Sequence, residues 1–103
     1  MSLTGAKIIH VFMFNLKPGV TEELKEQIFA AGRRITEIAG VLGVDIGPNI
    51  GDNPAYKYTG IFYHTSAQTR EVYRTHPIHR EFGDKWLRPN LENMVFINME
   101  VKY

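Results

Sequence analysis

The sequence contains no cysteine, and this excludes a disulfide framework, a thiolate zinc site and thiol chemistry. It also lacks an excess of one charge: 12 lysines and arginines against 11 aspartates and glutamates leave a net charge of +1, without the basic surplus of nucleic-acid-binding proteins. No apolar run reaches the ~20 residues that a membrane-spanning helix needs, and residues 1–6 lack the pattern of a signal peptide. We therefore expect a cytoplasmic protein that binds neither nucleic acid nor membranes.

The length of 103 residues suits a single domain over residues 1–103, because independent domains usually contain ~100–150 residues. We expect the ordered core to span about residues 7–103. Segments rich in β-branched and aromatic residues predict four strands, at residues 7–17, 41–46, 56–64 and 94–103. The motif Gly47-Pro48-Asn49 after the second strand predicts a turn.

Helical spacing of apolar residues predicts helices over residues 22–38, 67–75 and 78–87. Thr21 and Ser66 are the expected N-caps of the first two, and Pro77 separates the last two. The resulting order is β-α-β-β-α-β, which is typical of an α+β fold of the ferredoxin-like kind with a four-stranded antiparallel sheet.

Helices in this arrangement cover only one face of the sheet. The opposite faces of the first and last strands are nevertheless apolar, with Ile9, Val11, Met13, Ile97, Met99 and Val101. An apolar face of this extent requires a cover, and a second copy of the chain supplies one. We therefore predict a homodimer that packs sheet against sheet.

The segment from His76 to His79 is the most informative for chemistry. Pro77 suits the first position of a helix, so that His76 becomes the N-cap and His79 the third helical residue. The helix N-terminus and partial burial would lower the pKa of His79 and leave a neutral imidazole, which a general base requires. The break at Pro77 would bring Tyr73 close to His79, where its hydroxyl could hold a substrate oxygen.

His10 stands out as a polar residue within an apolar strand. We expect it to point to the helix side, into a chamber that it shares with His79 and Tyr73. The further residues expected to contact a substrate are Phe12, His76, Phe82, Gly83, Met94 and Phe96. An apolar chamber with two imidazoles and a phenol suits a small, hydrophobic, enolisable ligand.

Each of these residues also has a structural interpretation: His10 as a hydrogen-bonded core residue, His76 as a helix cap, and Tyr73 as part of the core or its rim. The arginines on the helices (Arg33, Arg34, Arg70, Arg74 and Arg80) are expected on solvated faces, where one could meet an acidic group of a ligand. A proline between His76 and His79 gives poor metal-ligand geometry, and no glycine-rich loop leads from a strand into a helix. We therefore predict neither a metal nor another cofactor.

Taken together and in this order, residues 10–14, 16–20, 44–49 and 76–82 resemble the stress-responsive A/B barrel domain (Dabb) family, over nearly the whole chain. The resemblance implies ferredoxin-like subunits whose sheets form a dimeric α+β barrel. Most members have no assigned activity. One plant member, olivetolic acid cyclase, closes a linear polyketide by an aldol condensation, and the resemblance to it implies His79 as the base, with Tyr73 and His10 beside it.

These observations predict a Dabb protein of unassigned activity that binds a small hydrophobic or carbonyl-containing ligand between sheet and helices. Three alternatives stay open. The first is a cofactor-free polyketide cyclase or aldol-type enzyme with a histidine base and a tyrosine. The others are a purely structural dimer that protects under stress and a cofactor-independent monooxygenase.

Overall fold

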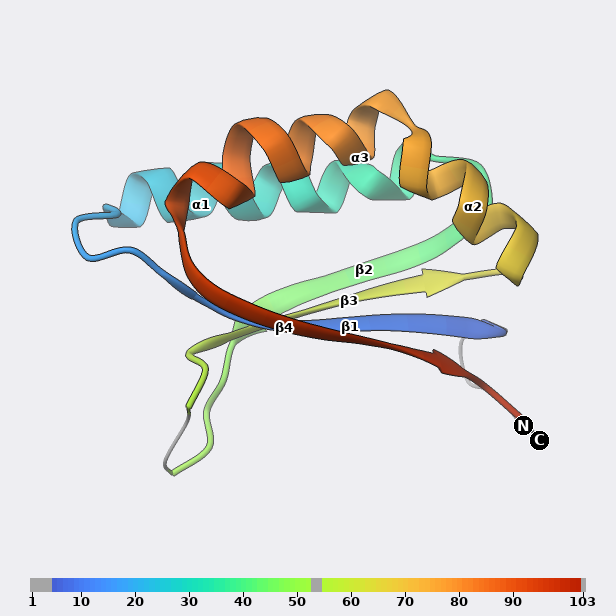
Figure 1. The fold of residues 1–103 in the computed structure, drawn as a ribbon, viewed down its shortest axis with the longest axis horizontal. Helices are drawn as coiled ribbons and strands as arrows, with labels where there is room; N and C mark the ends of the chain where they lie inside the picture. Colours follow the sequence, from blue (N-terminus) through green and yellow to red (C-terminus); the bar gives the residue numbers. More distant parts are fainter. Residues whose placement is uncertain (1–4, 53–54, 103) are drawn as a thin grey trace.

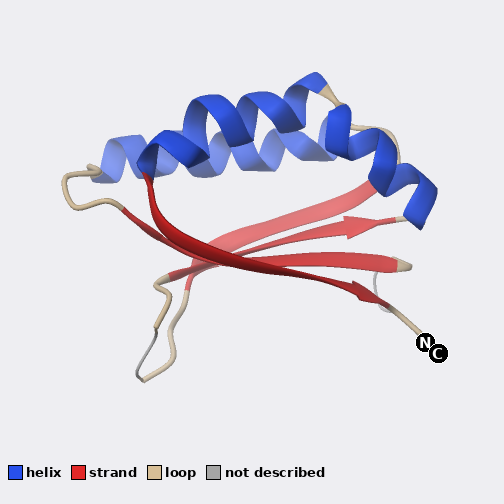
Figure 2. Ribbon diagram, in the orientation of Figure 1, coloured by secondary structure: helices blue, strands red, loops and turns tan. Residues whose placement is uncertain are grey.

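A computed structural model describes residues 5–52 and 55–102 of the chain. It has two layers, in which an antiparallel four-stranded sheet of order β2-β3-β1-β4 carries all the helices on one face (Figures 1 and 2). The elements in chain order are β1 (Ile8–Leu16), α1 (Glu22–Arg33), η1 (Arg34–Glu37), β2 (Val41–Pro48), β3 (Tyr58–His64), α2 (Ala67–Thr75), α3 (Pro77–Glu81), η2 (Phe82–Leu87), η3 (Arg88–Asn90) and β4 (Leu91–Glu100). The predicted ferredoxin-like α+β fold is confirmed.

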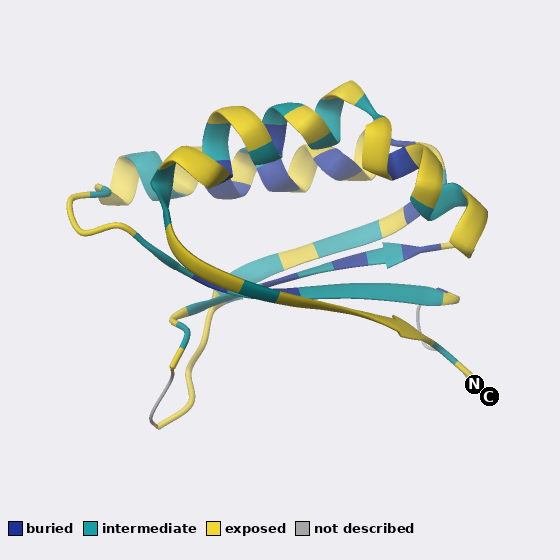
Figure 3. Cartoon of the chain, in the orientation of Figure 1, coloured by how far each residue is buried: buried dark blue, intermediate teal, exposed yellow. Residues whose placement is uncertain are grey.

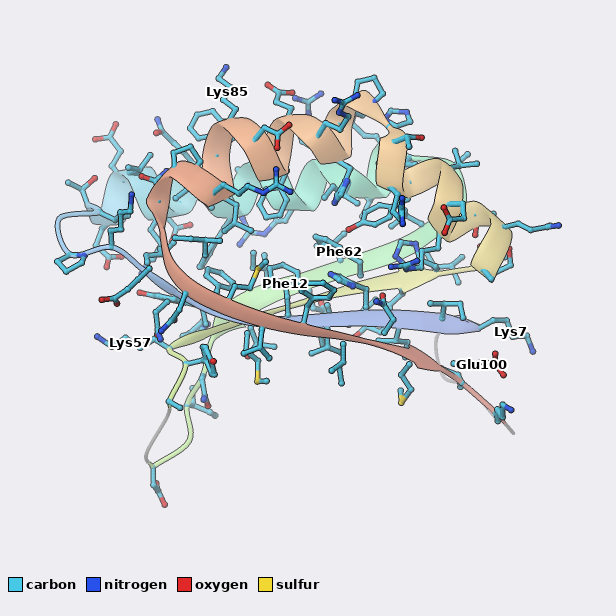
Figure 4. All side chains as sticks on the ribbon, viewed as in Figure 1. Lys7, Phe12, Lys57, Phe62, Lys85 and Glu100 are labelled. Atoms are coloured by element: carbon cyan, nitrogen blue, oxygen red, sulfur yellow. The ribbon has the colours of Figure 1, made fainter. Side chains whose placement is uncertain are left out.

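The core lies between the sheet and the helices, on the face of β1 that carries its even-numbered residues. Phe12 and Phe62 from the two central strands point into this layer (Figure 4), and both are buried. They pack with apolar side chains of the helices, among them Ile28, Phe29, Ile35, Tyr73, Phe82 and Leu87. The assignment of the even face of β1 to the helix side was therefore correct.

Two boundaries in the first half of the chain differ from the prediction. The first helix is α-helical only to Arg33, and the tighter 3₁₀ turn η1 continues it. The strand β2 extends to Pro48, which pairs with Tyr58, so the predicted turn at Gly47-Pro48-Asn49 was wrong at its first two residues. Proline is tolerated in this strand because β2 lies at the edge of the sheet.

The capping predictions were better. The Thr21 hydroxyl accepts a hydrogen bond from the Leu24 N–H at 3.1 Å, as expected of an N-cap. The helix α2 has the predicted bounds, and Ser66 caps it in a reciprocal capping box with Thr69. The third strand begins at Tyr58 rather than at residue 56.

Beyond Pro77 the backbone stays helical further than the prediction allowed. After α3 the helix widens into a π-helix, η2, in which the Arg88 N–H donates to the Gly83 carbonyl five residues earlier. The 3₁₀ turn η3 then leads directly into β4, which begins at Leu91 rather than at Met94 and ends at Glu100. The predicted end of this strand at Tyr103 lies outside the described residues.

The second face of the sheet has no helix over it (Figure 3), and two large apolar side chains of β4 on this face are exposed. Ile97 and Met99 of β4 are 59% and 48% exposed. Ile9, Val11 and Met13 of β1 lie on the same face and are only half-buried. In the part of the chain that the structure describes, no helix is long and apolar enough to cross a membrane.

Candidate functional site

A cavity of about 300 Å³ lies between the sheet and the helical segment around Pro77. It contains seven of the predicted site residues: His10, Phe12, Tyr73, His79, Phe82, Gly83 and Met94. The other lining residues are Phe62, Arg74, Arg80, Asp84 and Arg88. His10 thus shares one space with Tyr73 and His79, although more than sixty residues separate it from them in the sequence.

His79 is held in place by the helix break that precedes it. The Nδ1 atom of His76 accepts a hydrogen bond from the Ile78 N–H at 3.1 Å and caps α3, as predicted. The Nδ1 atom of His79 lies 3.1 Å from the Arg74 carbonyl oxygen. Because a carbonyl oxygen only accepts, Nδ1 of His79 carries the proton and the lone pair of the neutral ring is on Nε2. Burial lowers the pKa of His79 below its ordinary value, and the bond to Arg74 opposes this shift only in part.

His10 has the same tautomer for a similar reason. Its Nδ1 donates to the Asn98 side-chain oxygen at 2.8 Å, and that oxygen also accepts from the Arg70 Nε at 3.1 Å. Burial lowers the pKa of His10, although the bond to Asn98 acts in the opposite direction. The cavity therefore holds two neutral imidazoles whose Nε2 atoms carry the lone pairs.

Tyr73 supplies a phenol whose ring lies next to those of His79 and His64. It is 2% exposed, and its ring centroid lies 4.1 Å from that of His79 and 4.5 Å from that of His64. Burial raises the pKa of the Tyr73 hydroxyl, so the group stays protonated at neutral pH. With respect to residues 5–52 and 55–102, this hydroxyl makes no hydrogen bond, so a ligand in the cavity can receive one from it.

Two predicted contact residues do not line the cavity. His76 uses its ring to cap α3. Phe96 lies on the edge strand β4, 57% exposed, with its ring centroid 5.5 Å from that of His10. A contact of either residue with a ligand stays a prediction.

His64, the most buried histidine, was not among the residues predicted for the site. It is 0% exposed, and within the described chain neither ring nitrogen has a hydrogen-bond partner. Burial, with smaller contributions from His10, Arg70 and His79, lowers the pKa of His64 to about 4. The alternation of the third strand was the available signal, because it places His64 on the same face as the buried Phe62.

The mouth of the cavity is basic, with Arg74, Arg80 and Arg88 against Asp84. Arg88 was not among the arginines considered from the sequence. Over the described residues, no group of three or more histidine, aspartate or glutamate side chains is placed to hold a metal ion. The site offers acid–base chemistry instead: two imidazole lone pairs, one phenol proton and an aromatic wall.

A sequence model of the family described as the stress responsive A/B barrel domain, Dabb, matches residues 8–101 of this chain. No curated protein matches the sequence. Among solved structures, the Arabidopsis thaliana protein At3g17210 is similar with a TM-score of 0.84 and 21% identity, over 93% of this chain and 96% of that one.

Two further structures share the fold. A dimeric ferredoxin-like protein of unknown function from Thermobifida fusca has a TM-score of 0.82 and 20% identity, over 98% of this chain and 96% of its own. A hydroxynitrile lyase from Passiflora edulis has a TM-score of 0.83 and 18% identity, over 92% and 93% of the two chains.

Proposed function

We propose, since the chain belongs to the stress-responsive A/B barrel domain (Dabb) family, that it binds a small hydrophobic ligand with a carbonyl group. The observation that carries this proposal is the convergence of His10, Tyr73 and His79 on one cavity. A cavity of about 300 Å³ that combines an aromatic wall with polar and charged side chains is large enough for a small organic molecule and can orient it.

The same geometry supports a cofactor-free reaction as the second candidate function. The Nε2 atom of His79 would remove a proton from the carbon next to the carbonyl group. The Tyr73 hydroxyl would donate a hydrogen bond to the carbonyl oxygen as negative charge develops there. His10 would orient the ligand by accepting a hydrogen bond at its own Nε2. The proton on His79 then returns to the carbon, or passes to the product of an aldol-type closure such as that of the cyclase that the sequence resembles.

One experiment with two readouts tests both candidates. The neutral ketone 4-methylacetophenone is titrated into isotopically labelled protein in D₂O, and its acetyl protons are followed by NMR. Binding predicts saturable shifts of residues that line the cavity. Catalysis predicts deuterium exchange of the acetyl protons above the buffer rate, lost in His79→Gln and kept in the control Arg33→Gln, an exposed residue of α1 that does not line the cavity.

The outcomes are distinct. If no residue of the cavity shifts at millimolar ketone, the binding proposal fails. If the ketone binds but does not exchange, the binding proposal stands and the catalytic candidate fails for this substrate class.

The homodimer is also a proposal for this chain. It is supported by the exposed apolar face of the sheet, with Ile97 and Met99, and by the description of a protein of the same fold as dimeric. Burying this face in a sheet-to-sheet contact would remove the exposed apolar area from water.

Two expectations from the sequence remain part of the proposal. Residues 1–103 form one domain, which limited proteolysis tests by the size of the resistant fragment. The protein is cytoplasmic, which fractionation of the source cells tests directly.

A further inference from the structure

We infer that the ligand of this cavity carries a carboxylate in addition to its carbonyl group, and that Arg80 and Arg74 bind this carboxylate at the mouth. The inference rests on the proposed function, because it names the class of ligand that the same cavity takes.

The charge of the cavity lining supports an anionic ligand. Three arginines and one aspartate line it, while the chain as a whole has a net charge of only +1. Arg88 forms an ion pair with Asp84 across one helical turn. Their charges offset each other, which leaves Arg74 and Arg80 as the excess positive charge of the lining.

Both remaining guanidinium groups are available to a ligand. In the described parts of the chain, Arg80 has no ion pair and its side chain makes no hydrogen bond. Arg74 has one partner, Glu71, at 3.7 Å, and both of these side chains are more than half exposed. Such exposed pairs contribute about 0–1 kcal/mol and are easily exchanged for a better partner.

The backbone places these two arginines beside the acid–base group. Arg80 follows His79 directly in α3, and the carbonyl of Arg74 accepts the Nδ1 proton of His79. Both arginines line the same cavity as His79, so a carboxylate held by either guanidinium anchors the ligand in that cavity. Arginine binds carboxylates in a planar, two-bond geometry, so the contact also fixes orientation.

The interior of the cavity determines the chemical character of the part of the ligand that lies away from the carboxylate. Phe12, Phe62 and Phe82 line it and offer no charge, so the carbon skeleton lies there while the carboxylate stays at the wetter mouth. The combination describes a small hydrophobic keto acid.

The test compares 4-acetylbenzoate with 4-acetylbenzamide, which have similar shapes and differ in charge. We expect the benzoate to bind at least tenfold more tightly at low salt, and this preference to shrink as salt is added. Arg80→Gln should remove most of the preference, because it weakens the binding of the benzoate far more than that of the benzamide. The control is Arg33→Gln, an exposed arginine in the last turn of α1 that does not line the cavity.

Failure of this inference can be separated from failure of the proposed function. If benzoate and benzamide bind equally, the carboxylate inference is overturned and carbonyl binding stands. If Arg33→Gln reduces the preference as much as Arg80→Gln, the effect is general attraction by net charge, and the assigned site is wrong. If phenyl phosphate displaces 4-methylacetophenone at a lower concentration than 4-acetylbenzoate does, the anionic group of the ligand is a phosphate. If none of these compounds binds, the proposed function itself fails.

Discussion

At the scale of single residues, the chemistry of the site depends on which imidazole nitrogen atoms already form hydrogen bonds within the protein. His10 and His79 both donate from Nδ1, to Asn98 and to the Arg74 carbonyl, so each ring keeps its Nε2 lone pair. Tyr73 instead offers a hydrogen-bond donor, because its hydroxyl is protonated and makes no hydrogen bond to the described residues. Burial stabilises the neutral form of all three groups. One proton donor and two acceptors are therefore available at neutral pH.

Replacing Tyr73 with phenylalanine separates function from stability. The Tyr73→Phe variant keeps the buried ring and its contacts with His64 and His79, so we expect a free energy of unfolding within ~0.5 kcal/mol of the wild type. Ketone binding or exchange should fall at least tenfold, because the hydrogen bond to the carbonyl oxygen is lost. Urea denaturation and the NMR titration measure the two effects. A loss of stability above 2 kcal/mol would show that the hydroxyl has a structural partner.

His64 makes the protein sensitive to acid. Its pKa is about 4 in the folded chain and about 6.5 when unfolded, so between these values the unfolded state binds more protons. Stability is therefore highest above pH 6.5 and falls as the pH decreases towards 4. We expect a loss of about 2 kcal/mol between pH 7.5 and pH 5 from this residue, and the lowered pKa values of His10 and His79 act in the same direction.

Urea denaturation at pH 7.5 and pH 5 measures this effect. In His64→Leu the difference between the two pH values should be smaller by about 2 kcal/mol, since the leucine has no proton to bind. The matched control is His76→Asn, which removes a histidine that is only half-buried. An equal pH dependence in wild type and His64→Leu would contradict the assignment.

At the scale of elements, the close contact between strands β1 and β3 shapes the cavity wall. Gly60 pairs with Phe12, and a Cβ atom at position 60 would lie 2.1 Å from the Phe12 Cζ. The ring of Phe12 thus lies against the backbone of Gly60, and this contact holds it in the wall of the cavity.

The Gly60→Ala variant should disturb both stability and cavity. The added methyl group forces the Phe12 ring away from β3, at a cost of about 1–3 kcal/mol in the free energy of unfolding. The matched control is Gly47→Ala in the neighbouring strand β2, where a Cβ atom would meet nothing within 4 Å. Urea denaturation compares the two. Combining Gly60→Ala with Phe12→Leu should recover part of the lost free energy of unfolding. Equal stability of Gly60→Ala and Gly47→Ala would show that the contact between Gly60 and the Phe12 ring does not limit the side chain at position 60.

The elements also show how far a sequence can be interpreted. The helix α2 was predicted with the correct ends because Ser66 caps its start and Pro77 limits its end. The start of β4 was missed because Glu92 and Asn93 are exposed on an edge strand and give no apolar signal. Local capping and breaking residues can be recognised in a sequence, whereas the limits of an exposed edge strand depend on tertiary pairing.

The π-helix explains one omission at the site. Arg88 follows His79 by nine residues, which is about 2.5 turns of an α-helix and would place the two on opposite sides. The wider turns of η2 change this relation, and both residues line the cavity. No residue pattern in the sequence predicts that the Arg88 N–H bonds to the carbonyl of Gly83, five residues earlier, rather than to that of Asp84. His79, Tyr73 and His10 could be predicted because a proline and a strand alternation fix their directions.

At the scale of the whole molecule, the chain is a slab with extents of 40 × 33 × 18 Å. Its helices protect one face of the sheet and leave the other open (Figure 3). The beginning of β1 pairs with the end of β4, Ile8 opposite Glu100, so the apolar residues of both strands form one continuous surface. A second copy placed on this surface would turn two layers into four and enclose both sheets.

A charge placed at the centre of this surface should separate the dimer. We expect wild-type protein to have twice the 11.8 kDa mass of the chain in light scattering, and an unfolding midpoint that rises with protein concentration. Ile97→Lys should give a monomer, because the lysine would be buried without a partner in the contact. Val72→Lys is the control, since Val72 is equally exposed but lies on α2, in the helix layer. A monomeric wild type, or equal dissociation of the two variants, would show that the open face is not the dimer contact.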